Sequence, residues 1–251
     1  MLEDLVRERL AGWPAQWERY HWPGYTYEHT LRVRSLALAL GEREGANLRI
    51  IEMASLLHDI CKPVGRRHAQ AGAEEAERVL RGLGVRATER RRVCEAIALH
   101  CGDNQPDSAP ESRCLADADL IDGNFGLVAT WRFITIRAGH GTSLEETIGA
   151  MSEWLPRKDQ LLGWLLTPSG REIARQRSAR MRLFCEQLME EMRRPLPSRD
   201  GMVRVAGFFH DVRGGALLEE QVEALEGNGG GADGALAVIC RSLRREIAGL
   251  H

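Results

Sequence analysis

Residues of the kind that bind metal ions occur in a fixed order through the N-terminal half of the chain. The set comprises His29, the pair His58-Asp59, His68, His100 and Asp119. Each of them stands at the edge of an apolar segment with helical spacing, so helices would have to bring them together. Neutral imidazoles and ionised carboxylates are ligands that divalent metals accept. The sequence therefore predicts a metal site assembled from several helices.

A His-Asp pair is weak evidence by itself, because the chain contains two, His58-Asp59 and His210-Asp211. The first pair ends the segment IIEMASLLHDICK, whose apolar residues repeat with helical period. If this helix continues to Lys62, the pair and a cation share one helix end, and Pro63 marks the stop. The second pair lies in RVAGFFHDVRGG, a short apolar run that leads into glycines. We interpret His210-Asp211 as a chance pair.

The segments around the other histidines predict helices with one apolar face. His29 starts the pattern YEHTLRVRSLALAL, and Arg32, one turn later, is placed to support it. His68 opens HAQAGAEEAERVL, where a seam of alanine and glycine would let another helix approach closely. His100 ends RRVCEAIALH in register with its apolar face, and Gly102 follows as a stop signal. Helices with such faces can carry ligands into a shared site.

Two carboxylates in the segment LADADLIDG compete for the last ligand position. Asp119 shares a helix face with Leu115 and Asp122, whereas Asp117 projects elsewhere. Asp119 is therefore the preferred ligand, and Asp117 is the alternative. Asp122, one turn further along, is expected either to hydrogen-bond a ligand or to lie at the helix end.

From about Tyr25 to Gly126 the chain resembles the HD superfamily of metal-dependent phosphohydrolases. The signature of that family is a His, then a His-Asp pair, then a distant Asp. YEHTLRV is similar to the first helix segment of the family, and LLHDICKP is similar to its His-Asp-Ile-Gly-Lys variant, with Cys61 where glycine is usual. RRHAQAGAEEA, AIALH and ADLID are similar to the segments that follow. After Gly126 the resemblance fades.

The resemblance implies a role for each member of the set. The ligands of a first metal ion would be His29, His58, Asp59 and Asp119. In binuclear members two further histidines hold a second ion, and these match His68 and His100, with Asp59 as the bridging carboxylate. The resemblance also implies that Cys61 has little effect on metal binding, although it alters the approach to the site.

A site of this kind predicts phosphate chemistry. One or two divalent ions can lower the pKa of a bound water and neutralise charge on phosphoryl oxygens. Lys62, Arg66 and Arg67 follow the His-Asp pair and are the candidate substrate-binding residues, with Lys62 favoured as a point charge beside the metal. A solvated loop is the alternative for the two arginines. Asp59 and Lys62 are the predicted catalytic residues.

The favoured function is a metal-dependent phosphohydrolase that cleaves a phosphate ester or phosphoanhydride of a small metabolite or nucleotide with metal-activated water. Helix-borne histidine and carboxylate ligands suit Fe, Mn, Co, Zn or Mg, so the sequence does not choose the ion. The alternative is a binuclear-iron oxygenase of the same superfamily that acts on a small anionic substrate. A sensor or interaction module with a vestigial site is disfavoured, because every ligand position is filled.

Composition favours a cytoplasmic protein that acts on a small substrate. The chain has 251 residues, 43% of them hydrophobic, and a net charge of −2. Basic residues alternate with acidic ones, so the sequence lacks the cluster of basic residues expected of a protein that binds a nucleic-acid polymer. No apolar stretch is long enough for a membrane span or a signal segment. The six cysteines are scattered without paired spacing, as is typical of a reducing compartment.

Cys101 is the cysteine that directly follows a predicted ligand, His100. Its sulfur could touch a metal ion. A free cysteine is usually a small apolar core residue, however, so a buried thiol is the favoured interpretation.

The predicted fold class is all-α, an HD-domain helical bundle with additional C-terminal helices. Helices are expected near residues 2–20, 27–44, 47–62, 68–83, 87–100, 112–122, 124–138, 144–154, 169–193 and 233–249, and only Met202 to Phe209 shows a trace of strand alternation. Prolines near residue 195 divide the chain into an HD-type domain with flanking helices over 1–194 and a small appendage of unknown role over 195–251. The apolar stripe of the 169–193 helix suits packing on the main domain or on a second subunit, as in a homodimer.

Two further segments lie next to the predicted ligands. Residues 101–112, CGDNQPDSAPES, form a loop that either borders the substrate pocket or is a plain solvent loop. The 124–138 helix is unusually apolar and is expected in the core. Its arginines, Arg132 and Arg137, are candidates to reach a phosphate or a partner chain instead.

Overall fold

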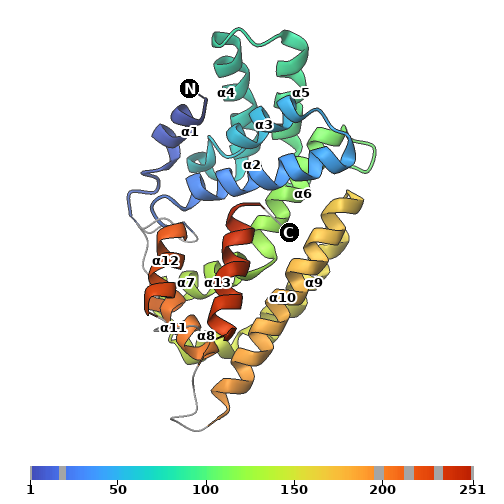
Figure 1. Cartoon of the computed structure of the whole chain (residues 1–251). Coiled ribbons are helices and arrows are strands. Elements are labelled where there is room, and N and C mark those ends of the chain that lie inside the picture. The colour runs from blue at the N-terminus through green and yellow to red at the C-terminus, as the bar shows by residue number, and fades with distance from the viewer. Residues whose placement is uncertain (1, 17–20, 195–200, 212–217, 229–233, 250–251) are drawn as a thin grey trace.

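The structure, a computed structural model, describes residues 2–16, 21–194, 201–211, 218–228 and 234–249. Within these ranges every regular element is a helix, and there is no strand. The predicted all-α class is therefore confirmed. Figure 1 shows the first six α-helices gathered at one end of the molecule and the later helices at the other. Within the described part of the chain, no helix is both long and apolar enough to cross a bilayer.

The first six helices form the bundle that positions the histidines. They are α1 (Leu2–Leu10), α2 (Tyr25–Glu44), α3 (Leu48–Leu57), α4 (His68–Gly82), α5 (Ala87–Leu99) and α6 (Pro110–Asn124), with the 3-10 helix η1 (Lys62–Arg67) before α4. Helix α2 packs against α3 and α6, and α4 packs against α5. The Asn47 side chain starts α3 by accepting hydrogen bonds from the backbone N–H groups of Arg49 and Ile50. A left-handed Gly45 ends α2.

A glycine in α4 allows this helix to approach the end of α3 closely. A Cβ atom at Gly72 would lie 3.2 Å from the backbone oxygen of His58 and 3.3 Å from the Ile97 side chain. Any larger residue would push α4 away, because these distances are already at the limit of van der Waals contact. The small-residue seam predicted for this helix therefore brings His68, at its start, toward His58.

The later helices cover the other end of the bundle. They are α7 (Leu127–Gly139), α8 (Leu144–Gly149), α9 (Met151–Leu161), the 3-10 helix η2 (Leu162–Trp164), α10 (Pro168–Met192), α11 (Met202–Asp211), α12 (Leu218–Asn228) and α13 (Gly234–Ile247). Helices α10, α11 and α13 all pack against α7. Phe209 stacks on Trp131 with ring centroids 4.3 Å apart, so α11 shares the hydrophobic core of α7. The stripe on α10, including Met181 and Leu188, is buried within the same core. The division of the chain at residue 195 stays a prediction.

Several predicted helix boundaries were wrong. The helix expected over 2–20 ends at Leu10, ahead of Gly12 and Pro14, and its last positions, 17–20, lie outside the described residues. The helix expected over 47–62 ends at Leu57 and is followed by turns. The helix expected over 144–154 is two helices that meet at Ala150.

Two C-terminal elements were also misjudged. Residues 202–209 are helical rather than extended, and Val205, Ala206 and Phe209 lie on one buried helical face. A short apolar run fits either period, so the pattern alone could not decide. Helix α12 was not expected from the sequence at all.

Candidate metal centre

Four histidines meet between the helices of the bundle. His29 lies in α2, His58 directly follows α3, His68 begins α4 and His100 directly follows α5. The ring centroids of His29 and His58 are 5.6 Å apart, those of His58 and His100 are 5.2 Å apart, and those of His68 and His100 are also 5.2 Å apart. The structure thus brings together the histidines that the sequence singled out.

The carboxylate of Asp59 lies between two pairs of these histidines. Its Oδ2 atom is 4.0 Å from Nε2 of His29 and 3.6 Å from Nε2 of His58. Its Oδ1 atom is 3.2 Å from Nε2 of His68 and 3.7 Å from Nε2 of His100. One buried carboxylate therefore presents one oxygen to each pair, as a bridging ligand would.

Backbone carbonyls fix the orientation of three of the rings. In each case Nδ1 contacts the carbonyl oxygen three residues earlier: His58 with Ser55 at 2.7 Å, His68 with Gly65 at 2.9 Å and His100 with Ile97 at 2.6 Å. A carbonyl oxygen only accepts hydrogen bonds, so each Nδ1 carries the proton and donates it. The Nε2 lone pairs are then left to face Asp59, which is the usual arrangement of metal-binding histidines.

The ring of His29 is held by a carboxylate and a guanidinium instead. Nδ1 of His29 lies 2.7 Å from Oδ2 of Asp122, and Arg32 donates to both oxygens of Asp122 at 2.9 and 3.1 Å. Burial opposes ionisation of Asp122, but Arg32 and His29 outweigh it and hold the pKa of this carboxyl well below its usual range. On the other side of the ring, Nε2 lies 3.0 Å from Oδ1 of Asp119. Asp122 thus takes the supporting position expected for it, and Asp119 faces the histidine cluster.

Nε2 of His58 is buried at the centre of this group without a hydrogen-bond partner. Oδ2 of Asp59 makes no hydrogen bond of good geometry either, but it lies 3.0 Å from the ammonium group of Lys62. Leaving a buried nitrogen unpaired costs about 1–3 kcal/mol, and a cation between His58 and Asp59 would satisfy it. Burial lowers the pKa of His58 to about 4, so its imidazole is neutral and able to bind a metal ion. Ligand atoms of His29, His58 and Asp59 all lie within 4.8 Å of one another. These residues fit a divalent ion.

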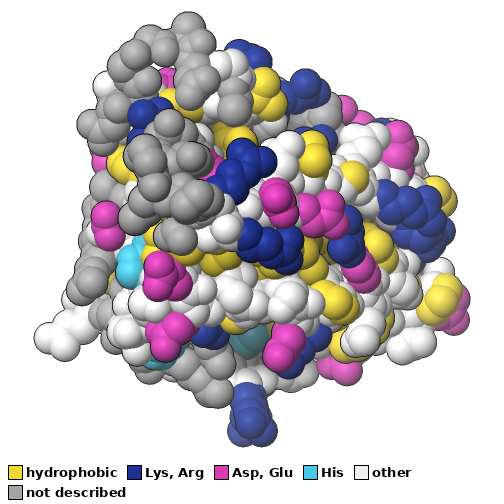
Figure 2. Space-filling model, turned by 90° about the horizontal axis from the view of Figure 1, so that it is seen from below, with side chains coloured by type: hydrophobic (Ala, Val, Ile, Leu, Met, Phe, Trp, Pro, Cys, Tyr) yellow, Lys and Arg dark blue, Asp and Glu magenta, His cyan; other side chains and the backbone are white. Residues whose placement is uncertain are grey.

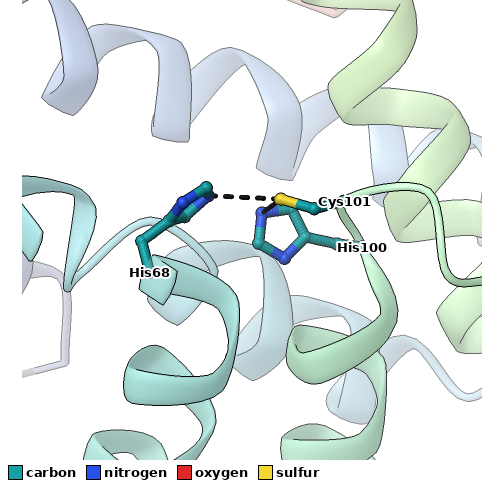
Figure 3. Close-up of side chains that lie close together, drawn as sticks. All are labelled: His68, His100 and Cys101. Atoms are coloured by element: carbon teal, nitrogen blue, oxygen red, sulfur yellow. Dashed lines mark hydrogen bonds between the residues drawn. The ribbon is translucent and has the colours of Figure 1, made fainter. Parts of the chain in front are cut away.

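A second group consists of His68, His100 and Cys101. The Sγ atom of Cys101 lies 3.3 Å from Nε2 of His68 and 3.2 Å from Nε2 of His100 (Figure 3). The expectation of a buried thiol was wrong, since Cys101 is exposed at the turn after α5. Partial desolvation would raise the pKa of this thiol, but the hydrogen bonds with His100 and His68 outweigh it and lower the value to about 7.

Asp117, the alternative ligand, lies elsewhere. Its carboxylate accepts hydrogen bonds from the backbone N–H of Leu166, the backbone N–H of Thr167 and the hydroxyl of Thr167, at 2.9, 2.8 and 2.6 Å. It therefore anchors the segment before α10, whereas Asp119, two residues along the same helix, faces His29. The structure thus places the two carboxylates on different sides of the helix, and the role of Asp119 as a ligand stays a prediction.

Of the three predicted substrate-binding cations, the structure places only Lys62 near Asp59. Its Nζ atom lies 3.0 Å from each carboxylate oxygen and 3.4 Å from Nε2 of His68. The tight turn after α3, in which the N–H of Lys62 donates to the carbonyl of Asp59, puts it there instead of the predicted longer helix. Arg66 and Arg67 are exposed on η1 and do not line the cavity, which corrects their predicted role.

A cavity of about 510 Å³ opens over this cluster. Its lining includes Lys62, Cys101 and residues of the loop predicted to border a pocket. It also includes Arg132, one of the two arginines considered for a phosphate, and two side chains that the sequence gave little reason to choose, His21 and Trp164. The guanidinium of Arg132 lies 5.0 Å above the ring of Tyr25, and its Nε is buried without a partner. Trp164 is 65% exposed on the rim, and only its size distinguishes it in the sequence.

The second His-Asp pair takes no part in the cluster. Nε2 of His210 lies 2.8 Å from the carbonyl of Thr142, which ties α11 to the segment before α8. The Asp211 side chain is 86% exposed. The interpretation of this pair as a chance match agrees with the structure.

A family model described as HD domain matches residues 26–124, the segment that holds the histidine cluster and Asp119. The chain therefore contains an HD domain over these residues. Solved HD-superfamily proteins share its fold, among them an HD-superfamily hydrolase from Bacillus thuringiensis, with 25% identity and a TM-score of 0.59 over 77% of this chain and 96% of that one.

Two relatives resemble this chain in sequence. The YpgQ protein of Bacillus subtilis, described as uncharacterized, is 27% identical over 176 residues, which cover 67% of this chain and 85% of YpgQ. Its crystal structure in complex with ADP has a TM-score of 0.57 at 23% identity, over 76% of this chain and 92% of that one. Ribonuclease Y of Chloroflexus aurantiacus is 35% identical over 100 residues, and the match spans 38% of this chain but only 18% of that enzyme.

The cavity is not made by the HD domain alone. All the proposed ligands, together with Lys62 and Cys101, fall within residues 26–124. Arg132 comes from α7 and Trp164 from η2, both beyond the HD domain. The later helices therefore add side chains to the mouth of the HD site.

Proposed function

We propose that this HD-domain protein is a metal-dependent phosphohydrolase that cleaves a phosphate ester or phosphoanhydride of a small metabolite or nucleotide with metal-activated water. The observation that carries the proposal is the convergence of four histidine Nε2 atoms on Asp59. One of the converging atoms, Nε2 of His58, is buried without a hydrogen-bond partner. A site that costs folding free energy when empty is consistent with one that holds cations.

The residues divide into two ligand sets that share Asp59. The first set is His29, His58, Asp59 and Asp119, and the second is His68, His100 and Asp59. When bound, such ions supply a water nucleophile at neutral pH and neutralise charge on phosphoryl oxygens. The chain's own part is to orient the imidazoles, through Asp122 and the backbone carbonyls described above.

Two cations of the chain are available to bind a phosphate in the cavity. Burial would lower the pKa of Lys62, but Asp59 and Asp119 raise it above its ordinary value, so the side chain stays an ammonium ion. Arg132 provides a guanidinium in the lining of the same cavity, suited to two phosphate oxygens at once. Together they would neutralise a phosphate group and orient it toward Asp59.

The size of the cavity and the surface charge support a small substrate. A volume of about 510 Å³ is in the range of small-molecule and cofactor sites. Basic and acidic side chains are interspersed over the face in Figure 2, which shows no continuous basic patch. YpgQ was crystallised with ADP, so nucleotides are the first substrates to test, with the exposed Trp164 ring available to a base.

The decisive experiment combines elemental analysis with a substrate panel. Purified protein is analysed for bound metals and assayed for phosphate or pyrophosphate release from nucleotides and sugar phosphates, and for cleavage of a single-stranded RNA. We expect at least one divalent ion per chain and release from a small substrate. Alanine at Asp59 that left metal content and activity intact would overturn the proposal, and cleavage of the RNA alone would overturn the small substrate.

A binuclear-iron oxygenase is the second candidate. The specific observation in its favour is the Asp59 carboxylate between two histidine pairs, which suits two iron ions equally well. Lys62 and Arg132 favour phosphate, although they would also bind another anion. Two irons per chain, with oxygen consumed and no phosphate released, would favour this candidate over the hydrolase.

A further inference from the structure

We propose that the thiolate of Cys101 is a ligand of the second metal ion, so that this ion is held by His68, His100, Asp59 and a sulfur atom. The inference rests on the proposed function, because it requires an ion at the second set of ligands. It adds a sulfur ligand to a site whose other protein ligands are nitrogen and oxygen. It therefore bears on which metal the protein uses.

The distances fit a common ion. On a tetrahedral zinc with bonds of about 2.0–2.3 Å to nitrogen, oxygen and sulfur, neighbouring ligand atoms lie roughly 3.3–3.6 Å apart. Sγ of Cys101 lies 3.3 and 3.2 Å from the Nε2 atoms of His68 and His100. Oδ1 of Asp59 lies 3.2 and 3.7 Å from the same two nitrogens. The separations between the imidazoles and the other two donors are thus already close to those of a bound ion.

The backbone explains how consecutive residues can face the same ion. His100 is the C-terminal cap of α5, and Cys101 lies in the turn that follows. Gly102 has a φ of +99°, so the chain reverses directly after Cys101 in a conformation that L side chains rarely adopt. Because Nδ1 of both imidazoles is engaged by a backbone carbonyl, the Nε2 atoms point toward the sulfur (Figure 3).

The environment of Cys101 differs from that of the other cysteines. Three of the six are buried, namely Cys114, Cys185 and Cys240, and Cys61 and Cys94 are partly buried against the core. Cys101 alone is exposed, and it lines the cavity. Core packing accounts for the others but does not account for a thiol placed between two imidazoles.

Lys62 also takes part in this arrangement. Its ammonium group lies 3.0 Å from both oxygens of Asp59 and 3.4 Å from Nε2 of His68. A second cation among His68, His100 and Cys101 would repel this ammonium from Asp59. The long side chain can then turn into the cavity, where a substrate phosphate would receive it.

A sulfur ligand narrows the choice of metal. Thiolates favour borderline and soft ions such as zinc, cobalt and iron, whereas magnesium and manganese prefer oxygen ligands. We therefore expect the second position to prefer zinc or cobalt to manganese. The first position has no sulfur ligand and carries no such preference.

The test uses the full chain loaded with cobalt(II) under reducing conditions. A thiolate bound to cobalt gives an intense near-ultraviolet charge-transfer band, which imidazole and carboxylate ligands do not give. Wild type, Cys101→Ser and the matched control Cys61→Ser are compared by absorption spectroscopy and elemental analysis. Cys61 is a suitable control because it lies two residues after Asp59 yet packs against the core.

We expect the band in the wild type and in Cys61→Ser, and its loss in Cys101→Ser, with the second ion bound at least roughly 10-fold more weakly. Two bound cobalt ions without the band, or a band that persists in Cys101→Ser, would overturn the sulfur ligand and leave the proposed hydrolase standing. A wild type that binds no cobalt or other divalent ion would overturn both.

A second variant guards against misfolding of Cys101→Ser. Cys101→Asp replaces sulfur with oxygen at the same position, so it should still bind two ions but lack the band. In competition between zinc and manganese, it should shift the second position toward manganese by at least roughly 10-fold relative to wild type. An unchanged preference would contradict the proposal.

Discussion

The two halves of the candidate metal centre are built differently. The deep half, His29, His58 and Asp119, lies among the helices α2, α3 and α6, and its supports are the buried Asp122 and Arg32. The open half, His68, His100 and Cys101, lies at a helix start and a helix end next to the cavity. Its supports are the backbone carbonyls of Gly65 in η1 and Ile97 in the last turn of α5. Asp59 belongs to both halves.

This difference suggests that the two positions would exchange ions at different rates. In the deep half, motion of His29 away from the site would break its buried hydrogen bond with Asp122. In the open half, His68 and Cys101 can move without disturbing the core, because His68 begins α4 and Cys101 lies in the exposed turn after α5. We therefore expect an ion in the deep half to resist chelators and an ion in the open half to be removed first.

The largest effect is expected from Asp59→Ala, which removes an oxygen from both halves. Both ions should be lost, and phosphate release should fall by roughly 10³-fold or more, since metal assistance contributes several kcal/mol to such a reaction. Elemental analysis and the phosphate assay measure the two effects. Asp211→Asn, in the second His-Asp pair, is the matched control and should change neither. If Asp59→Ala kept one ion and its activity, the halves would be independent.

Asp122→Asn should weaken the deep half alone. It leaves the Arg32 guanidinium buried without its carboxylate, which should lower the free energy of unfolding by about 3–5 kcal/mol. Loss of the support to His29 should also weaken the first ion by roughly 10- to 100-fold. Denaturant unfolding of the metal-free protein and metal titration separate the two effects.

A surface ion pair provides the control for Asp122→Asn. Glu3→Gln interrupts the exposed contact with Arg7 and should leave the unfolding midpoint unchanged. If Asp122→Asn weakened both ions equally, the deep and open halves would not be separable.

Much of the deep half could be predicted from the sequence. His29, His58 and Asp119 lie on or next to regular helices, so helical register fixed the direction of their side chains. Helical register also distinguished Asp119, which faces the site, from Asp117. The Asp117 carboxylate anchors the segment before α10. A periodic pattern carries this information because every residue of a helix has a defined azimuth.

The open half and the cavity were harder to predict. Cys101 was expected to be buried because free cysteines usually pack in the core. Its actual position depends on a turn beyond the helix end, where no periodicity applies. Lys62 lies beside Asp59 because of a tight turn, although a longer helix was predicted. Arg132 and Trp164 reach the cavity through tertiary packing of α7 and η2, which a pattern of apolar residues does not encode.

The third prediction concerns the order in which ions are lost. His68→Ala removes a ligand from the open half only, so the protein should keep one ion per chain and retain its unfolding free energy within about 1 kcal/mol, because the residue begins α4 and is not in the core. Elemental analysis after brief chelation of wild type should give the same single ion. Loss of both ions in His68→Ala would show that the deep half cannot bind alone.

The smallest effects distinguish the cations around the cavity. Arg132→Ala should raise KM by roughly 10-fold while metal content stays unchanged, since its guanidinium lines the cavity on the side of Tyr25 and His29. The double variant Arg66→Ala/Arg67→Ala should leave KM within about twofold, because these exposed side chains on η1 do not line the cavity although they directly precede His68 in sequence. A larger rise in KM for the double variant than for Arg132→Ala would mean that the substrate approaches over η1. The substrate phosphate would then bind beside the open half of the centre.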